Sequence, residues 1–393
     1  MKREKIGNIL QMQRGYDLPS SQMKEGNIPV VGSNGIVGYH NTSKCILPTI
    51  TIGRSGSAGK VHYYEEPTWV HNTALYLTDF KENNPKYLYY LLQLLHLEKL
   101  CGSSVIPSLN RNVVYPMVVN FHEDRHEQDA IANILSLIDK KIALNREINR
   151  NLEAMARQLY DYWFVQFDFP DENGKPYKSS GGKMVWNERL KREIPDGWKD
   201  VDLKEYLKCI SERIQVSERD GYIYTPIEVL ARKQMSFSDY APIEEATSGL
   251  CKYRESDILL SNRRVYFHKV CIAPSDGITR DTVIVLRSQA DLLGYSFQLV
   301  FSDHFISYAT HHSYGSEQPV LSWEAAKKYK VLKPSLNLDY KYSSISNNII
   351  SQIISNEREI REMVKYRDEL LPLLMNGQAS VMPPEVNCDL SHD

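Results

Sequence analysis

The chain lacks the features of a membrane-spanning or secreted protein. None of its apolar runs approaches the roughly 20 residues that a helix needs to cross a bilayer. The N-terminal segment MKREKIGNILQMQRGYD contains no long apolar stretch and no small-residue cleavage site, which argues against a secretory leader. These absences predict a cytoplasmic protein.

Cysteine is scarce and unpaired. No CxxC pair occurs among the six cysteines, which are Cys45, Cys101, Cys209, Cys251, Cys271 and Cys388. This distribution argues against a zinc ribbon and against a disulfide framework. We interpret the cysteines as buried free thiols of a cytoplasmic protein.

The chain also lacks an excess of positive charge. The formal net charge of its 393 residues is −2, so a role with nucleic acid would require local basic faces. Apolar residues make up 42% and charged residues 24%, which is typical of soluble globular proteins, and the length predicts two or three domains. The 25 tyrosines suit surfaces that are partly apolar and partly polar, as interfaces are.

Catalytic motifs are absent or incomplete. The segment GRSGSAGK at 53–60 differs from a P-loop, because its glycine spacing is one residue too long and Val61 follows Lys60 where Ser or Thr would bind magnesium. Pro170-Asp171 and 202–204 match only the loosest nuclease pattern, and His311-His312 has no partner at ligand spacing. No GxGxxG motif, Asn-Pro-Pro-aromatic motif or nucleophile elbow occurs. The sequence therefore predicts a non-catalytic chain without a cofactor or metal of its own.

An internal repeat has a period near 210 residues. Similar segments recur in the same order: 53–54 and 262–263, 72–74 and 281–283, 107–109 and 319–321, 146–148 and 358–360. Chance matches would scatter, so the shared order and the nearly constant offset predict a duplicated unit. In this alignment Arg54 corresponds to Arg263.

Each half has the same order of elements. A mixed, strand-rich region of about 120 residues contains one helical stretch, at 85–100 in the first half and 289–301 in the second. A long helix with a heptad-like apolar stripe follows, at about 123–164 and 340–374. At about 1.5 Å per residue each helix is roughly 50–60 Å long, so it must pack on the other helix or on a partner.

The predicted stripes define the seam of the helix pair. In the first helix the stripe contains Ile131, Leu135, Ile138, Ile142, Ile148, Leu152, Met155, Leu159 and Trp163, and in the second it contains Ile345, Ile349, Ile350, Ile353, Ile360, Val364, Leu371 and Leu374. Asn145 and Glu357 fall on this seam. They either fix its register or mark a solvated gap.

These patterns predict an α+β protein with a pseudo-two-fold repeat. The expected parts are a first mixed, strand-rich domain (1–122), a central long helix (123–167), a linker (168–199), a second mixed, strand-rich domain (200–336), a C-terminal long helix (337–376) and a flexible tail (377–393). The linker is inferred from its Gly, Pro, Ser and Lys content.

Several loops carry side chains suited to DNA. Arginine suits guanine, Asn and Gln suit adenine, and Arg or Lys suits phosphates. The candidates in the first half are Arg14, Tyr16, Ser33, Asn34, Arg54, Ser55, Lys60, Asn110 and Arg111. Those in the second half are Arg213, Arg232, Lys233, Asn262, Arg263, Arg264, Tyr266 and Lys269. For any one of them an ordinary polar loop is the alternative interpretation. Arg54 and the pair Arg263-Arg264 are favoured, because both follow an apolar strand at equivalent positions of the repeat.

The sequence resembles the specificity subunits of Type I restriction-modification systems along essentially its whole length. The similar segments are QRGYDLP (13–19), IPVVGSNGIVGYHN (28–41), IGRSGSAGKV (52–61), WVHNTALY (69–76), NILSLIDKKIALNREINRNLE (133–153), WFVQFDFP (163–170), IPDGW (194–198) and RDELLPLLMNGQ (367–378). The region 200–334 departs more from the family pattern, so its contact residues are less well defined.

The resemblance implies a function that spacing alone does not show. It implies that each domain reads one half of a bipartite site in double-stranded DNA. It also implies that the helices pair as an antiparallel coiled coil, set the gap between half-sites and dock two methyltransferase subunits, which restriction subunits then join. S-adenosylmethionine, ATP and magnesium would be bound by those partner chains.

Two other classes of protein remain as alternatives. A self-sufficient methyltransferase or nuclease is disfavoured by the missing catalytic motifs. A helical scaffold that binds only proteins is disfavoured by the cationic loops in both halves.

Overall fold

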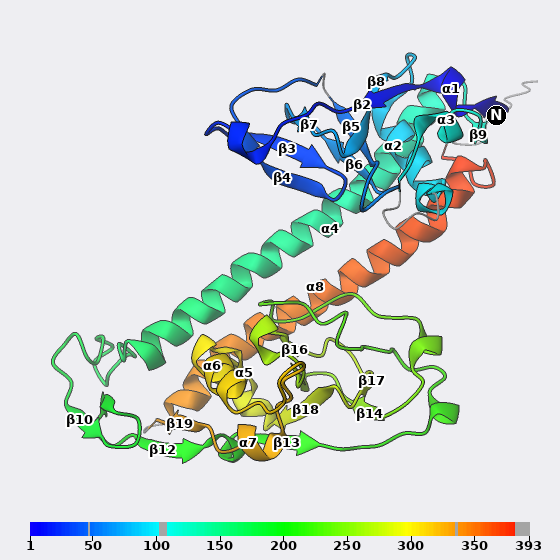
Figure 1. Ribbon diagram of the computed structural model, residues 1–393. Helices are drawn as coiled ribbons and strands as arrows, with labels where there is room; N and C mark the ends of the chain where they lie inside the picture. Colours follow the sequence, from blue (N-terminus) through cyan, green and yellow to red (C-terminus); the bar gives the residue numbers. More distant parts are fainter. Residues whose placement is uncertain (46–47, 102–107, 335–336, 382–393) are drawn as a thin grey trace, which may run out of the picture. The chain divides into compact units, whose positions relative to one another are not determined.

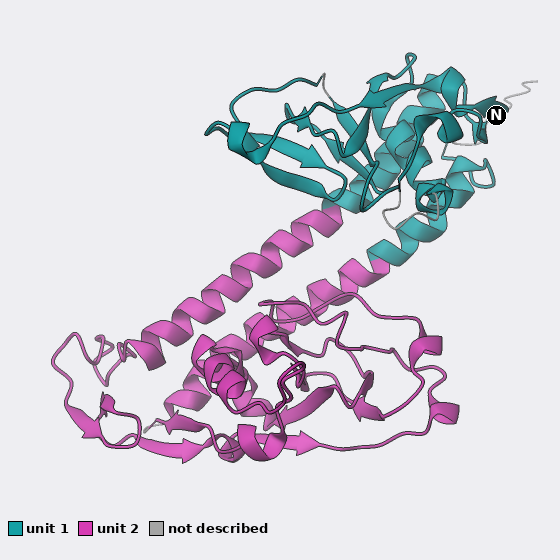
Figure 2. Ribbon diagram, viewed as in Figure 1, with its two compact units in different colours: residues 1–140, 363–393 teal, residues 141–362 magenta. Residues whose placement is uncertain are grey.

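The computed structural model describes residues 1–45, 48–101, 108–334 and 337–381. The chain divides into two compact units, coloured separately in Figure 2. Unit 1 comprises residues 1–140 and 363–393, and unit 2 comprises residues 141–362. Each unit is described by itself. The predicted tail (377–393) lies outside the described residues from residue 382 onward.

Unit 1 is built on a four-stranded antiparallel sheet (Figure 1). Its order is β2 (Gln11–Arg14), β8 (Ala74–Asp79), β5 (Thr49–Gly53) and β6 (Val61–Tyr64). A second sheet has the order β4 (Gly35–His40), β3 (Ile28–Gly32) and β7 (Trp69–Val70), and β1 (Lys2–Lys5) pairs with β9 (Val118–Phe121). All five residues of β5 are buried, as its apolar sequence TITIG predicts for a central strand.

Four α-helices begin in unit 1: α1 (Ile6–Ile9), α2 (Pro85–Leu94), α3 (Arg111–Val114) and the long α4 (Arg125–Tyr160). Asn84 caps α2 by accepting from Tyr87 N, and Pro85 occupies the first turn, where its missing N–H costs nothing. The helix predicted at 85–100 is interrupted. His96 adopts a left-handed conformation (φ 48°), and a 3₁₀ turn at Leu97–Leu100 follows.

Unit 2 is built on a four-stranded antiparallel sheet with the order β13 (Leu207–Ile210), β18 (Val283–Ser288), β15 (Ile258–Ser261) and β16 (Val270–Ile272). Three further pairs are β12 (Lys199–Asp202) with β19 (Lys330–Lys333), β14 (Leu250–Tyr253) with β17 (Gly277–Arg280), and β10 (Met184–Asn187) with β11 (Arg192–Pro195). The helices are α5 (Leu293–Phe301), α6 (Asp303–His311), α7 (Trp323–Ala326) and the long α8 (Leu338–Met375).

The segment predicted as a linker (168–199) is largely ordered structure. It contains the β10–β11 hairpin, and Phe169 stacks on Trp198 with ring centroids 5.2 Å apart. Both rings are buried in the core of unit 2. Its Gly, Pro and Ser content places the turns of the segment correctly, but composition does not reveal that its aromatic residues anchor it.

The two units repeat one topology. The strand orders β2-β8-β5-β6 and β13-β18-β15-β16 correspond strand for strand, and every neighbouring pair is antiparallel. The pair β1–β9 corresponds to β12–β19, and helices α2 and α3 correspond to α5 and α7. The predicted α+β fold with a duplicated unit is therefore confirmed.

The long helices pair antiparallel within each unit. In unit 1, Arg367 Nη1 lies 3.0 Å from Asp139 Oδ1. In unit 2, Lys141 Nζ lies 3.1 Å from Glu359 Oε1, and Tyr342 donates to Ala156 O at 2.9 Å. Residue numbers fall along α8 as they rise along α4, which defines the direction of the pair. A five-residue π-helical turn, Asp161–Val165, follows α4.

The helix seam follows a strict heptad pattern that the predicted stripe missed in its middle. A series of buried and half-buried positions with spacings of four and three runs through 131, 135, 138, 142, 145, 149, 152, 156, 159 and, in the π-turn, 163, and further buried residues such as Ala132 and Ser136 lie beside it. Two predicted seam residues, Ile148 and Met155, are instead 37% and 58% exposed, and Ile345 of α8 is 44% exposed. The prediction skipped buried Asn149 and Ala156 because it counted only larger apolar side chains.

Candidate nucleic-acid interface

Equivalent loops of the two units carry cationic side chains. In unit 1 the loop joins β5 to β6 and has the sequence RSGSAGK (54–60), and in unit 2 the loop joins β15 to β16 and has the sequence NRRVYFHK (262–269). A backbone hydrogen bond of the same kind closes each loop at its base, from Gly53 N to Lys60 O at 2.7 Å and from Ser261 N to Lys269 O at 2.9 Å. The repeat therefore presents the same structural position twice.

The backbone corrects the sequence alignment of these loops by one residue. Arg54 N donates to Thr73 O and Arg54 O accepts from Leu109 N, while Asn262 N donates to Thr282 O and Asn262 O accepts from Leu321 N. The counterpart of Arg54 is therefore Asn262, and Arg263 corresponds to Ser55. The alignment was wrong because the two loops differ in length by one residue, which a constant offset cannot accommodate.

Four of the predicted contact residues in unit 1 line one cavity of about 270 Å³. Arg14 comes from the end of β2, Arg54 from the β5–β6 loop, and Asn110 and Arg111 from the start of α3. Leu75, Ser108 and Leu109 complete the lining. The fold thus brings together three guanidinium groups that are far apart in the sequence.

Backbone carbonyls hold these arginines in place. Arg14 Nε donates to Asn72 O at 3.2 Å, Arg54 Nη1 donates to the same oxygen at 3.5 Å, and Arg111 Nη1 donates to Met12 O at 3.1 Å. Within the described part of the chain, none of the three forms an ion pair with a carboxylate. Their positive charges are therefore available to a ligand.

Two glycines of the β5–β6 loop allow its backbone to turn. Gly56 and Gly59 have φ of 82° and 89°, and a Cβ at Gly59 would collide with the backbone of Glu98. Glycine adopts such conformations without steric cost. At the end of the loop, exposed Lys60 donates to Asn34 Oδ1 at 2.8 Å. Asn34 lies in the tight turn between β3 and β4.

Three predicted contacts of unit 1 make contacts within the fold. Ser33 is buried; its hydroxyl donates to Thr73 O and accepts from the backbone N–H groups of Arg54 and Ser55. The Ser55 backbone also bridges to Ser108. The Tyr16 hydroxyl lies 3.0 Å from that of Tyr76, and its half-buried ring packs against the buried cluster around Val31 and Val70.

In unit 2 the cationic loop surrounds a 3₁₀ turn, Val265–Phe267. Arg264 before this turn and His268 after it both adopt left-handed backbone conformations (φ 47° and 53°). Arg264 and Tyr266 are exposed. The guanidinium of Arg232 lies over the Phe267 ring, 4.1 Å from its centroid. This stacking fixes a cation beside the loop, as cation–π contacts do.

The other candidates of unit 2 differ in accessibility. Lys233 is exposed and pairs with Asp303 at 3.3 Å, and Arg213 is also exposed. Arg263 is half-buried. Two candidates are engaged within the fold: Asn262 Nδ2 donates to Asp281 O at 2.7 Å, and Lys269 Nζ donates to Ile227 O at 2.6 Å. Burial lowers the pKa of Lys269.

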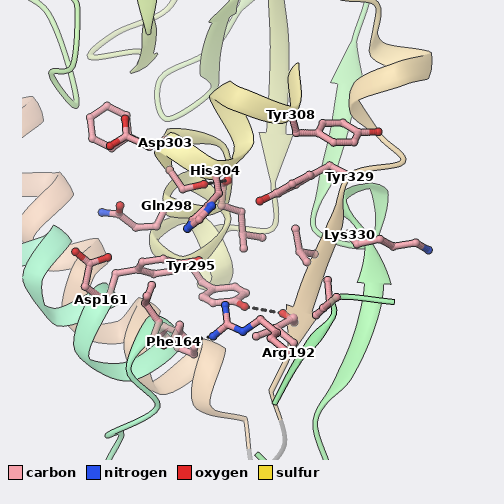
Figure 3. Close-up of a pocket in the computed structure, with 18 of the residues that line it drawn as sticks. Asp161, Phe164, Arg192, Tyr295, Gln298, Asp303, His304, Tyr308, Tyr329 and Lys330 are labelled. Carbon is pink, nitrogen blue, oxygen red and sulfur yellow. Dashed lines mark hydrogen bonds between the residues drawn. The ribbon is translucent and has the colours of Figure 1, made fainter. Parts of the chain in front are cut away.

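A larger cavity of about 630 Å³ lies in unit 2 between the end of α4, the β10–β11 hairpin, α5, α6 and β19 (Figure 3). Tyrosines and Phe164 line much of it, and Tyr295 donates to Leu332 O at 2.6 Å. Arg192 points into the cavity, half-buried, and burial lowers its pKa. Acidic and basic groups are mixed around it, so the cavity has no single sign of charge. In the described residues no cluster of His, Cys, Asp or Glu could hold a metal.

The predicted seam residues lie along the pairing helices. Ile142, Asn145, Ile350, Glu357 and Leu371 are buried, and the half-buried members are Ile138, Leu152, Leu159 and Val364. Asn145 donates to Glu359 Oε2 at 2.7 Å rather than to Glu357. Of the two interpretations of Asn145 and Glu357, the hydrogen bonds favour a fixed register over a solvated gap.

Sequence reasoning missed three contributors. Asn149 is buried on the seam and follows Asn145 by four residues, so helical spacing could have found it. Phe267 supports Arg232, and Asn72 holds two arginines through its backbone oxygen. No residue type in the sequence signals a backbone acceptor, so the contribution of Asn72 required the structure.

The fold is that of a Type I specificity subunit. The chain superimposes on the crystal structure of the Type I restriction-modification S subunit from M. genitalium with a TM-score of 0.62 and 17% identity, covering 95% of this chain and 96% of that one. No helix in the described residues is long and apolar enough to span a membrane.

Sequence comparison finds similarity to the same class of protein. Residues 1–154 match the family described as Type I restriction modification DNA specificity domain. The chain is 23% identical to the Type I restriction enzyme MjaIX specificity subunit of Methanocaldococcus jannaschii over 312 residues, which are 75% of this chain and 69% of that protein. A segment of 66 residues, 17% of this chain, is 36% identical to the HindI specificity subunit of Haemophilus influenzae and covers 14% of it. The predicted resemblance to Type I specificity subunits is thereby confirmed.

Proposed function

We propose that this chain is the DNA-reading specificity subunit of a Type I restriction-modification complex. The observation that supports this best is the pair of equivalent loops, β5–β6 and β15–β16, each with cations that have no carboxylate partner among the described residues. Arg54 and Lys60 lie in the first loop, and Arg263 and Arg264 lie in the second. Cations on loops are what contact with DNA phosphates and base edges requires.

Two copies of one reader explain a bipartite target. Each unit would read one half-site, and the structure supports separate readers because each has its own sheet and its own cationic loop. Duplex DNA repeats about every 34 Å, so half-sites separated by whole turns present the same face of the duplex to two similar readers. The helices α4 and α8 would set the gap between them.

An exposed apolar stripe supports docking of another subunit. Within unit 2, Leu144, Ile148, Met155 and Tyr162 are 55%, 37%, 58% and 37% exposed. Their spacings of four, seven and seven residues place them along one side of α4 and its π-turn, beside the seam. Such a stripe is typical of a helix that packs against a further partner. We assign it to a methyltransferase subunit.

The remaining chemistry would belong to partner chains. Methylation and cleavage would require S-adenosylmethionine, ATP and magnesium on the modification and restriction subunits, in a cytoplasmic complex with two modification subunits. This chain would contribute recognition and no catalysis.

The test is to express the chain with its modification subunits and map methylated sites in the host genome. The proposal predicts one bipartite motif. Replacing residues 1–122 with another recognition domain should change one half-site only, and inserting one heptad into α4 should change the gap, since seven residues add roughly 10 Å. A change in both half-sites, or an unchanged gap, contradicts the corresponding part of the proposal.

The alternatives give different results. A self-sufficient enzyme would methylate or cleave DNA as the purified chain with S-adenosylmethionine or magnesium. A protein-only scaffold would be insensitive to Arg54→Ala and Arg263→Ala but sensitive to changes in the helices.

A further inference from the structure

The arginine cavity of unit 1 has no charged counterpart in unit 2. Arg54 corresponds to Asn262, as the backbone hydrogen bonds show. The counterpart of Arg14 is Ser211, which follows from the strand register. Gln13, just before Arg14, pairs with Tyr76. Ile210, just before Ser211, pairs with Val285, the counterpart of Tyr76.

The remaining two positions come from matching helix caps. Asn110 caps α3 by accepting from Asn112 N, and Ser322 caps α7 by accepting from Ala325 N. Asn110 therefore corresponds to Ser322, and Arg111 corresponds to Trp323. The four lining positions read Arg, Arg, Asn, Arg in unit 1 and Ser, Asn, Ser, Trp in unit 2. Three positive charges are thus present in one repeat and absent from the other.

We propose that the cavity lined by Arg14, Arg54, Asn110 and Arg111 binds one phosphate of the DNA backbone, and that unit 2 has no such phosphate site. This inference rests on the proposed DNA-binding function. It gives the two recognition units different contributions to binding, because unit 1 supplies a fixed backbone anchor that unit 2 lacks at the same place.

Charge favours a phosphate over a base. Three guanidinium groups surround the cavity without a carboxylate partner among the described residues, so an anion would be strongly preferred there. A base edge offers only neutral donors and acceptors. Bidentate recognition of guanine uses one coplanar arginine, and two further arginines would remain uncompensated.

The shape of the cavity also favours a phosphate over a base. The residues line a hollow of about 270 Å³ instead of projecting from the surface. A base inside a duplex cannot enter a hollow without leaving its stack, which costs a few kcal/mol. A phosphate already protrudes from the duplex. Each arginine uses one N–H for a backbone carbonyl, which orients the side chain and leaves its other donors for the tetrahedral oxygens.

The experiment measures binding of the full chain to two duplexes, one with its mapped target and one with the same bases scrambled. Arg14→Gln, Arg54→Gln and Arg111→Gln are each expected to weaken both complexes by the same factor, about 3- to 10-fold near 0.1 M salt. Replacing all three should lower the slope of log affinity against log salt concentration by about one. The preference for target over scrambled DNA should not change.

Two controls separate the cavity from bulk charge and from repeat position. Arg125→Gln removes an exposed arginine of unit 1 that pairs with Asp129 at 2.8 Å, outside the cavity. Ser211→Gln makes a change of similar bulk at the unit 2 counterpart of Arg14. Both are expected to leave affinity and salt slope near those of the unchanged chain.

Lysine variants distinguish the loss of a positive charge from a folding defect. Arg14→Lys and Arg111→Lys keep the charge, so a chain with a phosphate site here should retain most of its affinity for DNA. Bidentate reading of a base would be lost. Loss of target preference with an unchanged salt slope overturns the phosphate assignment and leaves the DNA-binding function standing. Glutamine variants that fold and bind normally also overturn it. An unchanged chain that binds both duplexes equally contradicts the proposed function itself.

Discussion

The side-chain amide of Asn149 donates a hydrogen bond to Glu357 Oε1 at 2.8 Å inside the helix pair of unit 2. Asn149 Oδ1 accepts from Asn356 Nδ2 at 2.7 Å. Asn149, Asn356 and Glu357 are all buried, and burial raises the pKa of Glu357. A buried polar group is costly only when it is unpaired, so this contact favours the one register in which all three side chains meet.

Asn149→Ala should therefore lower the free energy of unfolding by about 1–3 kcal/mol, because Glu357 and Asn356 lose their partner in a buried place. Urea denaturation measures the change. Asn151→Ala is the matched control, since Asn151 is exposed on the same helix. Equal effects of the two substitutions would show that the buried contact adds nothing beyond helix propensity.

Glu153 gives unit 2 a pH-dependent stability. Burial raises its pKa to about 7, although its carboxylate accepts a 2.7 Å hydrogen bond from Met235 N. The folded state therefore binds the proton more tightly than the unfolded state does, and stability falls as pH rises from about 4.5 toward 7. Glu153→Gln keeps the acceptor oxygen and removes the charge.

This variant should gain about 1–3 kcal/mol over the unchanged chain at pH 8 and almost nothing at pH 4.5. Thermal unfolding at a series of pH values measures the difference. Glu147→Gln changes an exposed carboxylate of the same helix and serves as the control. A gain of the same size at both pH values would contradict the elevated pKa.

The two glycines of the β5–β6 loop should respond differently to alanine. Gly59→Ala forces a collision with the backbone of Glu98, whereas a Cβ at Gly56 meets nothing within 4 Å. Both residues have positive φ, so each substitution costs about 1 kcal/mol of strain, and only Gly59→Ala adds a clash. We expect Gly59→Ala to destabilise unit 1 further and to weaken DNA binding through displacement of Arg54. Similar melting temperatures for the two variants would refute this account.

The exposed stripe of α4 can be tested by a charge at Met155. Met155→Glu should leave folding and DNA binding intact but weaken assembly with the methyltransferase subunit by at least about 10-fold, because a desolvated charge would face an apolar contact. Ala154→Glu places the same charge on the adjacent exposed residue, about 100° around the helix. Co-purification and analytical ultracentrifugation compare the two. Equal assembly would remove the stripe as the docking surface.

The sequence predicts regular periodicity better than it predicts exceptions. The repeated topology and the long helices follow from hydrophobic spacing, whereas the middle of the seam does not, since Asn149 and Ala156 are not large apolar residues. The β10–β11 hairpin was missed because turn-rich composition conceals the few aromatic residues that anchor it. Local pattern contains no information on such tertiary contacts.

For the candidate site, too, the sequence predicts residue types but not the tertiary contacts that bring them together. Sequence singled out Arg14, Arg54, Asn110 and Arg111 as polar loop residues, but only the fold brings them to one cavity. Pairing Arg54 with Arg263 failed by one residue because loop length varies between repeats. Ser33, Tyr16, Asn262 and Lys269 have the residue types of DNA contacts, yet they are engaged in holding loops and strands in place.

The last described turns of the chain return to the unit in which the chain begins. His122 Nε2 lies 3.0 Å from Leu374 O, Asn120 donates to Asn376 at 3.0 Å, and Gly377 lies against Met1. Residues 1 and 377 are therefore close together in unit 1, so a linker could join the end of the chain to residue 1 while new ends are opened in the exposed turn at 172–174. Circular permutation should then preserve both readers, which means that their order along the polypeptide is not essential to the folded molecule.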